Sequence, residues 1–387
     1  MAEVTATPVV VTNGTYIRPY TDAWVIASTV FISTFFAFGV CANSVTIAVI
    51  KTSRHLKSRY YSFLLSMCFS DLTSGFVSIL FLYRRTWGFD YFEWPEFFCR
   101  LYWGLDLWTS FSTALHILSF AILRLVGVRW PTLFKQISPT HMTIWISSIW
   151  VITFLGGFIP HFLFNTVNVI DRFNDPSSAR WASCSLSSYW FTTWQQYVQV
   201  AYGFYLYLPA VAIIGISIAI AALLKQRKKP GDCYVIKNTI AVSSVSQIIE
   251  SSPNLHTSRR SLKMTSQLRR QKKDRQAILQ LFLIVGSFLF GYIPLTAFHF
   301  YTGFTINISN NVINAFDWRF AMVQYLMLRF SECMNPVFYN LASGKMRGET
   351  KKFLAKLCRC INADDVITSQ RGVASTSVVT SQKALNL

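Results

Sequence analysis

The stretch WVIASTVFISTFFAFGVCANSVTIAVI, residues 24–50, contains no charged side chain. A helix that crosses a hydrocarbon core of about 30 Å needs about 20 predominantly apolar residues, and this stretch is longer than that. Six further runs have similar length and apolar character. They are residues 61–83, 101–123, 142–164, 197–224, 277–300 and 320–341. Because backbone polar groups in lipid must be bonded internally, the seven runs predict an all-α bundle of seven transmembrane helices.

The overall composition supports lipid as the main solvent. Hydrophobic residues make up 52% of the 387 residues and charged residues only 14%, against roughly 25% in soluble domains. The 8 Cys are too few for a disulfide scaffold, and no Cys pair with a His partner suggests zinc. No nucleophile elbow or phosphate loop appears, so neither an enzyme nor a cofactor is expected. The net charge of +19 could suggest a nucleic-acid partner, but the sequence contains no nucleic-acid-binding motif, so that partner is not expected.

The distribution of Lys and Arg predicts the orientation of the spans. Most of these 36 residues lie in the first, third and fifth connections and after the seventh run. Cytoplasmic segments carry such an excess, so the amino terminus is predicted outside the plasma membrane and the carboxyl terminus inside. Sequons at Asn13 and Asn307, candidate glycosylation sites, fall on predicted outside segments. The exceptions to the basic bias are Arg18, Arg84, Arg85, Arg100, Arg172, Arg180, Arg319 and Arg329.

The chain divides into four parts by composition. Residues 1–23 form the predicted extracellular segment, and residues 24–341 form the seven-span domain, which includes a long polar cytoplasmic loop at 225–275. Residues 342–360 include a short basic amphipathic stretch, which predicts a helix lying along the inner membrane face. Residues 361–387 are rich in Ser and Thr and are predicted to form a disordered cytoplasmic tail.

Charged side chains within the runs are the first functional candidates, because a charge near mid-bilayer costs at least about 2.5 kcal/mol. They are Asp71, Asp106, Arg329 and Glu332, with Arg124 at the cytoplasmic end of the third run. Arg329 and Glu332 are three residues apart and could pair on one helix. Alternatively, Arg329 reaches Asp106 across the bundle while Glu332 joins Asp71. The sequence leaves both pairings open.

Short motifs recur in most of the runs. Cys99 and Arg124 flank the third run, the sixth contains FLFGYIP at 288–294, and the seventh ends with NPVFY at 335–339. Further motif residues are Asn43, the run LSMCFSD at 65–71, Trp150, Pro160 and Pro209. In order and spacing these residues resemble the rhodopsin-like family of G protein-coupled receptors, over residues 24–360. The family patterns are LSxxxxD, FxxCWxP and NPxxY.

The resemblance implies a receptor that binds an extracellular ligand and activates a heterotrimeric G protein, with arrestin and a receptor kinase acting on the tail. It also implies a disulfide between Cys99 and Cys184 and palmitoylation at Cys358 and Cys360. The switch residues that it implies are Arg124, Phe288, Pro294, Pro336 and Tyr339. A hydrated polar core, able to hold sodium in the resting state, is implied at Asn43, Asp71, Thr113, Ser331, Glu332 and Asn335.

Several positions depart from the family pattern. Leu123 stands where the family has an acidic residue before Arg124, and Leu125 replaces the Tyr that follows. Without the neighbouring carboxylate, we expect a weaker resting lock and raised basal activity, testable with Leu123→Asp. Gly291 and Tyr292 replace the usual Cys and Trp, so the details of the switch are expected to differ.

The predicted ligand cavity lies toward the outer ends of the spans. Asp106 matches the position at which amine receptors of the family bind an ammonium group, which taken alone favours a biogenic amine. Arg329 is predicted to face the same cavity and could neutralise Asp106, so a short neuropeptide is favoured over an amine. Arg329 also occupies the position of the retinal-binding Lys in the family, which disfavours a light receptor, because no Schiff base can form there. The expected ligand contacts are Asp106, Tyr202, Tyr205, Tyr292, Thr296, His299, Tyr325 and Arg329.

A seven-span transporter or channel is the competing class. Such proteins commonly contain repeated halves or broken spans at corresponding positions, and no internal similarity of that kind is found. Solute flux across vesicles, compared with nucleotide exchange on an added G protein, distinguishes the two classes.

Overall fold

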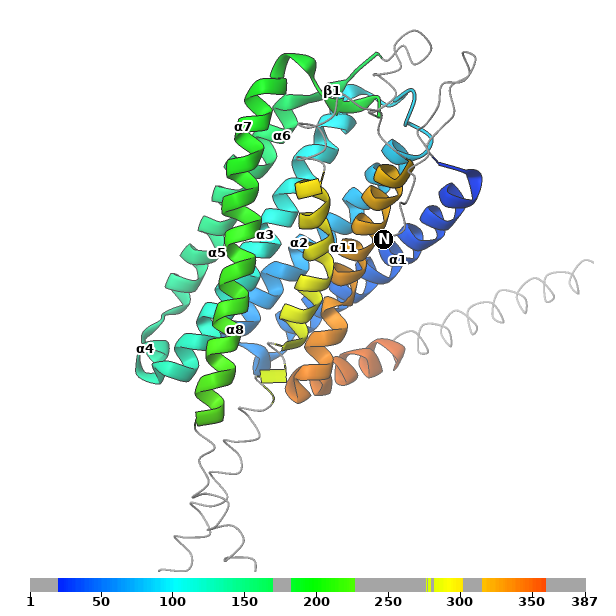
Figure 1. The fold of residues 1–387 in the computed structure, drawn as a ribbon. Coiled ribbons are helices and arrows are strands. Elements are labelled where there is room, and N and C mark those ends of the chain that lie inside the picture. The colour runs from blue at the N-terminus through cyan, green and yellow to red at the C-terminus, as the bar shows by residue number, and fades with distance from the viewer. Residues whose placement is uncertain are drawn as a thin grey trace, which may run out of the picture.

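The computed structural model describes residues 20–169, 182–226, 276, 278–279, 282–301 and 315–359. Long helices lie side by side in one bundle, and a final short helix, 344–359, turns away from them at one end (Figure 1). Helix α1 (Asp22–Thr52) packs against α2 (Arg59–Arg85) and against α11 (Ala315–Ala342), so the first and last spans are neighbours. The described structure therefore has the shape expected of a transmembrane helix bundle.

Helix α3 (Glu96–Arg129) is the central element of the bundle. It contacts α2 on one side and the helices of the fourth and fifth spans on others. The remaining elements are η1 (Arg54–Leu56), α4 (Pro131–Gln136), α5 (Pro139–Thr153), η2 (Phe154–Phe158), α6 (Ile159–Phe164), η4 (Ser188–Trp190), α7 (Phe191–Tyr202), η5 (Gly203–Tyr207), α8 (Leu208–Gln226) and the helix 282–301.

Six helical segments of the described chain are long and apolar enough to cross a membrane. They are Asp22–Thr52, Arg59–Arg85, Glu96–Arg129, Pro139–Phe164, Ser188–Gln226 and Phe282–Tyr301. The seventh, α11, is more polar because it buries Arg329 and Glu332, but its 28 residues are ample for a crossing at about 1.5 Å per residue. The predicted seven-helix bundle is confirmed. Most helices extend a few residues beyond the apolar runs, since charged residues at helix ends can reach the headgroups.

The outside of the bundle is apolar. Large hydrophobic side chains on five spans have more than half of their surface exposed, and in a membrane this surface faces lipid rather than water. They include Phe31, Phe76, Val151, Val200 and Phe282. The charged side chains of Asp71, Arg329 and Glu332 within the spans are instead buried, which is the reverse of a soluble helix bundle.

Two spans contain a π-helical turn directly before a proline. Residues Phe154–Phe158 form such a turn in the fourth span, and Gly203–Tyr207 form one in the fifth; Pro160 and Pro209 are the second residues of the helices that follow. Proline cannot donate a backbone hydrogen bond, and its ring crowds the carbonyl four residues earlier. A wider turn accommodates both effects. The sequence identified Pro160 and Pro209 as motif residues, but it did not indicate the π-helical turns before them.

A short antiparallel hairpin adds strands to the predicted all-α architecture. Strand β1 (Asn165–Val167) pairs with β2 (Cys184–Leu186), with Val167 opposite Cys184. Both strands have only three residues, too few for an alternating pattern to reveal them. The hairpin lies across the end of the bundle opposite to helix 344–359 (Figure 1). We call these the disulfide end and the Arg124 end, after Cys99–Cys184 and Arg124.

Several predicted features lie outside the described residues. These are the sequons at Asn13 and Asn307, most of the segment 1–23 and of the loop 225–275, Cys360 and the tail 361–387. Helix 344–359 covers most of the predicted 342–360 segment, and Cys358 near its end is exposed.

Candidate functional site

Arg329 lies at the centre of a buried charge cluster that joins α3 and α11. Its Nη1 donates to Glu332 Oε2 at 2.7 Å, and its Nη2 donates to Asp106 Oδ1. The side chain of Arg329 is only 3% exposed, whereas that of Asp106 is 14% exposed. Arg329 therefore binds both of the partners that the sequence left open, and Glu332 pairs with Arg329 while Asp71 accepts a hydrogen bond from Asn335. Ser74 on α2 donates to the same Glu332 oxygen, which links a third helix to the cluster.

Aromatic rings close the cluster toward the disulfide end. The guanidinium carbon of Arg329 lies 4.4 Å from the centroid of the Tyr325 ring. Tyr325 is stacked face to face with Phe81 of α2. Cation–π contacts strengthen where water is excluded, so this ring pair both covers the ion pairs and attracts the arginine. Tyr325, an expected ligand contact, is brought beside Asp106 and Arg329.

The six residues of the predicted polar core are divided among several contacts. Asn335 Nδ2 donates to Asp71 Oδ2 at 2.9 Å, joining α11 to α2. Thr113 instead bonds Ser70 at 2.9 Å, and Ser331 bonds Ser287 of the sixth span at 3.0 Å. Asn43 donates to a carbonyl of its own helix, that of Gly39. In the described part of the chain, Asn43, Asp71, Glu332 and Asn335 each retain a buried oxygen without a hydrogen-bond partner, and the other carboxylate oxygen of Glu332 is bonded to Arg329.

The other expected ligand contacts lie in different surroundings. Tyr202 is buried with its ring centroid 4.3 Å from that of His299, which connects the fifth and sixth spans. Tyr292 is buried and donates to the Ser110 carbonyl at 2.9 Å. Tyr205 turns away from this group, because it stacks on Phe111 and donates to a fourth-span carbonyl. Thr296 is half-buried.

Close packing explains why the FLFGYIP motif has glycine at position 291. A Cβ at Gly291 would lie 2.9 Å from the Cβ of Ser331, so only glycine allows the sixth span to approach α11 this closely. Phe288 and Tyr292 stack on each other with centroids 4.3 Å apart. Among the remaining predicted switch residues, Pro294 is half-buried, while Pro336 and Tyr339 are buried in α11.

Arg124 is held by aromatic rings. Its guanidinium carbon lies 3.9 Å from the Tyr60 centroid and 4.9 Å from that of Phe120. Tyr60 stacks in turn on Phe134 of α4, and Arg59 covers Phe134 at 5.1 Å. At the Arg124 end, two stacked rings are thus each contacted by a guanidinium group, Phe134 by Arg59 and Tyr60 by Arg124. The sequence predicts that Arg124 is weakly held in the resting state, because no carboxylate precedes it. It does not reveal the contact with the Tyr60 ring.

The surroundings of Leu123 and Gly127 explain this stack. Leu123 is fully buried in an apolar cluster with Phe63, Met142 and Ile149, so the position before Arg124 serves packing. A Cβ at Gly127 would lie 2.7 Å from the Tyr60 hydroxyl. Glycine therefore leaves the space that Tyr60 needs to reach Arg124.

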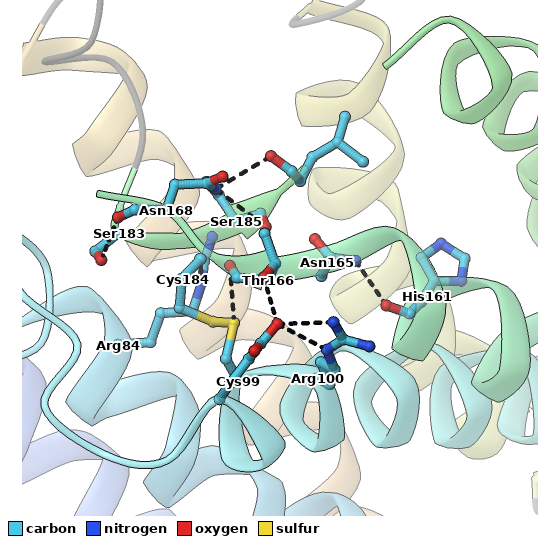
Figure 2. The surroundings of a disulfide bond; sticks show 12 residues. Arg84, Cys99, Arg100, His161, Asn165, Thr166, Asn168, Ser183, Cys184 and Ser185 are labelled. Atoms are coloured by element: carbon cyan, nitrogen blue, oxygen red, sulfur yellow. Dashed lines mark hydrogen bonds and ion pairs between the residues drawn. A yellow bond between two sulfur atoms is a disulfide. The ribbon is translucent and has the colours of Figure 1, made fainter. Parts of the chain in front are cut away.

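The disulfide end is closed by a covalent bond and a network of polar contacts. Cys99 at the start of α3 is bonded to Cys184 of β2, as Figure 2 shows. Glu96 accepts hydrogen bonds from Arg100 and from Thr166 of β1. Arg84 of α2 donates to the Cys184 carbonyl at 2.6 Å. The hairpin is therefore fixed to both α2 and α3, above the Arg329 cluster.

Sequence reasoning missed several residues that the structure brings to these sites. Tyr60, Ser74, Phe81 and Arg84 each contact a predicted residue or the disulfide, but they lie on helix faces that a single sequence does not identify. Their one common signal is a polar or aromatic side chain inside or at the end of an apolar run. In the described part of the chain, no group of three or more His, Cys, Asp or Glu side chains is arranged to hold a metal ion.

Comparisons with known proteins agree with this architecture. Residues 42–339 match the model of the family described as 7 transmembrane receptor (rhodopsin family). This range spans most of the chain and includes the ion pairs of Arg329, the disulfide and the NPVFY motif. A search of curated proteins gives no match. The chain therefore belongs to the rhodopsin family of seven-transmembrane receptors, and it is a membrane receptor rather than an enzyme.

Proposed function

We propose that this plasma-membrane receptor binds an extracellular ligand at the disulfide end and activates a heterotrimeric G protein at the Arg124 end. The main support is the Arg329 cluster, because one side chain joins Asp106 on α3 to Glu332 on α11 and, through Glu332, to Ser74 on α2. A ligand that changes the partners of Arg329 changes the packing of three helices. Such a bundle can have two arrangements, each favoured by a different partner.

The disulfide supports the orientation, with the amino terminus outside. Disulfides persist in oxidising compartments and are rare in the cytosol, so the end that carries Cys99–Cys184 is assigned to the outside. Lys225, Lys345 and Lys351 lie near the opposite end, in agreement with an excess of positive charge on the cytoplasmic side. The same end presents Arg124 and helix 344–359 to a cytoplasmic partner.

A short peptide is the ligand class that the cluster favours. An amine would have to compete with Arg329 for Asp106, and Arg329 is additionally held by Glu332. A peptide carries several polar and charged groups, so it can engage Asp106 and Arg329 together and fill space beside Tyr325 and Tyr202. The partial exposure of Asp106 allows such contact from the disulfide end.

Sodium is proposed as a resting-state ligand of the deeper polar core. Buried oxygens of Asp71, Asn335 and Asn43 have no hydrogen-bond partner in the described part of the chain. Hard cations prefer oxygen donors of this kind, so these residues fit the ion. Bound sodium would supply positive charge beside Asp71. Replacement of sodium chloride by choline chloride should change basal nucleotide exchange in the wild type and have no effect in Asp71→Asn.

The test of the main proposal is nucleotide exchange on purified G proteins by the full-length receptor in lipid discs, with a library of short peptides and biogenic amines. We expect a peptide to accelerate exchange. Asp106→Asn and Arg329→Gln should each reduce its potency, whereas Arg319→Gln, an exposed arginine of the same helix as Arg329, should not.

Two results would overturn parts of this proposal. An amine response that is lost in Asp106→Asn but retained in Arg329→Gln would replace the peptide by an amine. A receptor that moves solute across vesicles and never accelerates exchange would point to a transporter.

A further inference from the structure

Two consecutive arginines end helix α2 at the disulfide end, and neither belongs to the Arg329 cluster. Arg84 is 3% exposed and Arg85 is half-buried. Adjacent buried guanidinium groups repel each other, and each loses hydration, so a protein rarely keeps such a pair without a compensating anion. The surroundings of Arg84 and Arg85 therefore indicate where such an anion could bind.

The two side chains lie on either side of the seam between α2, α3 and α11. The guanidinium carbon of Arg84 is 4.5 Å from the centroid of Trp103 on α3, and its Nε donates to the Cys184 carbonyl. The guanidinium carbon of Arg85 is 4.8 Å from the centroid of Trp318 on α11. Figure 2 shows Arg84 reaching toward the disulfide and the hairpin. Rings and a carbonyl hold the two cations in place without neutralising them.

Both charges act on one point, the Tyr20 side chain just before α1. Its hydroxyl donates to the Trp318 carbonyl at 3.0 Å. Burial raises the pKa of Tyr20, and the positive charges of Arg85 and Arg84 oppose that rise. Both guanidinium groups therefore lie on the same side of the bundle as Tyr20, with Trp103 beside one and Trp318 beside the other.

No carboxylate of the described chain neutralises this pair. The ion pairs there use Arg100, Arg329 and Lys352, and none uses Arg84 or Arg85. Arg84 Nη1 and Arg85 Nε are buried and have no hydrogen-bond partner in the part that the structure describes. Asp106 interacts electrostatically with Arg84, but its carboxylate is already bonded to Arg329. Fixed donors with unused N–H groups therefore remain near the disulfide end.

We propose that Arg84 and Arg85 form an anion subsite that takes a carboxylate of the extracellular ligand, flanked by Trp103 and Trp318. Guanidinium groups bind carboxylates through short, charge-assisted hydrogen bonds, often two at once. The proposal rests on the proposed receptor function and narrows its ligand class to acidic ligands. In a peptide, the carboxylate is either the free carboxyl terminus or an acidic side chain.

The subsite is tested by direct binding to the full-length receptor in lipid discs, measured as ligand-dependent shifts of the thermal unfolding midpoint. The probes are the tripeptide Tyr-Trp-Phe as free acid and as amide, and Tyr-Trp-Asp-amide against Tyr-Trp-Asn-amide. We expect the carboxylate member of at least one pair to bind about tenfold tighter, as one charge-assisted contact allows. The pair that shows the preference identifies the source of the carboxylate.

Substitutions test whether Arg84 and Arg85 cause the preference for the carboxylate probe over its amide. Arg84→Gln and Arg85→Gln should each reduce it to about threefold or less, and Arg85→Gln leaves the Cys184 contact of Arg84 intact. The matched control is Arg319→Gln, an exposed arginine at the same end whose guanidinium also lies over a ring, that of Trp24. It should retain the full preference.

Three outcomes overturn the subsite: equal binding of the carboxylate and amide members, no binding of any probe, or an undiminished preference in both variants. Nucleotide exchange is measured separately. Failure to accelerate exchange with any peptide of the library would count against the receptor proposal, while a carboxylate preference in binding would still support the subsite.

Discussion

Two arginines inside this receptor are held by different chemistry. Arg329 is bonded to the carboxylates of Asp106 and Glu332, whereas Arg124 lies against the rings of Tyr60 and Phe120. Hydrogen-bonded ion pairs are directional and depend on both charges being present. A ring face attracts a cation more weakly and over a wider range of positions. The comparison suggests a bundle that is firmly fixed near the disulfide end and easily released at the Arg124 end.

The largest effect is expected from Arg329→Gln. Removal of the shared cation leaves the buried Glu332 and the largely covered Asp106 without a positive partner, which should lower the free energy of unfolding by about 3–5 kcal/mol. Thermal unfolding in lipid discs measures this loss. Arg319→Gln, exposed on the same helix, should change stability by less than about 0.5 kcal/mol.

A neutral version of the cluster provides the critical control. Arg329→Gln combined with Asp106→Asn and Glu332→Gln removes every charge while keeping groups that can form hydrogen bonds. Most of the lost stability should return, since the cost comes from unpaired charge. A triple variant as unstable as Arg329→Gln alone would mean that the arginine acts through packing.

The next largest loss of stability is expected from Leu123→Asp. This substitution places a carboxylate beside Arg124, as Asp106 and Glu332 lie beside Arg329. Leu123 is fully buried against Phe63, Met142 and Ile149, so the new carboxylate would enter an apolar cluster. We expect a loss of about 3 kcal/mol in the free energy of unfolding, with Leu123→Met as the volume-matched control. Retained stability together with lower basal exchange would instead support the carboxylate lock that the sequence suggested.

A smaller effect is expected from Tyr60→Leu, which removes the ring that faces Arg124. The cation–π contact contributes about 0.5–2 kcal/mol, so basal nucleotide exchange should rise by roughly two- to thirtyfold. Tyr60→Phe keeps the ring face and should stay near the wild-type rate. Tyr61→Phe is the control at the neighbouring position, where the hydroxyl contacts Ser343. A rise in Tyr60→Phe equal to that in Tyr60→Leu would assign the effect to the hydroxyl.

The smallest effect concerns pH at the Arg124 end, where Glu349 is the one described carboxylate. Hydrogen bonds from Lys352 and Ser53 lower its pKa below the ordinary 4.5. A depressed pKa stabilises the folded arrangement above the unfolded pKa, and this stabilisation is lost as pH falls through the folded value. Helix 344–359 should therefore loosen only below pH 4.5.

A spin label on the exposed Cys358, in a background with Cys41→Ser, Cys233→Ser and Cys360→Ser, reports this loosening as increased mobility. In Glu349→Gln the mobility should already be raised and independent of pH. If the wild type shows no change on acidification, the contact with Ser53 does not hold the helix.

The sequence predicted the spans well, because lipid imposes one simple requirement on every run. It also predicted Cys99–Cys184, which follows from the family resemblance. The pairing of Arg329 could not be decided, since Glu332 is near in sequence while Asp106 is near only in the folded bundle. Arg329 has two donor groups that reach both, and sequence spacing alone does not reveal this.

The ring partners of Arg124 were harder to foresee. Tyr60 lies at the start of a span, where aromatic residues are common for reasons of membrane anchoring. Its role depends on the absence of a side chain at Gly127 and on the stacking of Phe134 from α4. Three separated segments set this contact, so no local pattern contains it.

The π-helical turns at Phe154–Phe158 and Gly203–Tyr207 have a consequence for any map of this receptor's surface. Each turn inserts about one extra residue, which rotates everything beyond it by roughly 100° relative to an unbroken α-helix. A cysteine scan of the fourth or fifth span will therefore show its lipid-facing stripe change phase at these turns. Helical wheels drawn through either whole span will assign the wrong face to half of it.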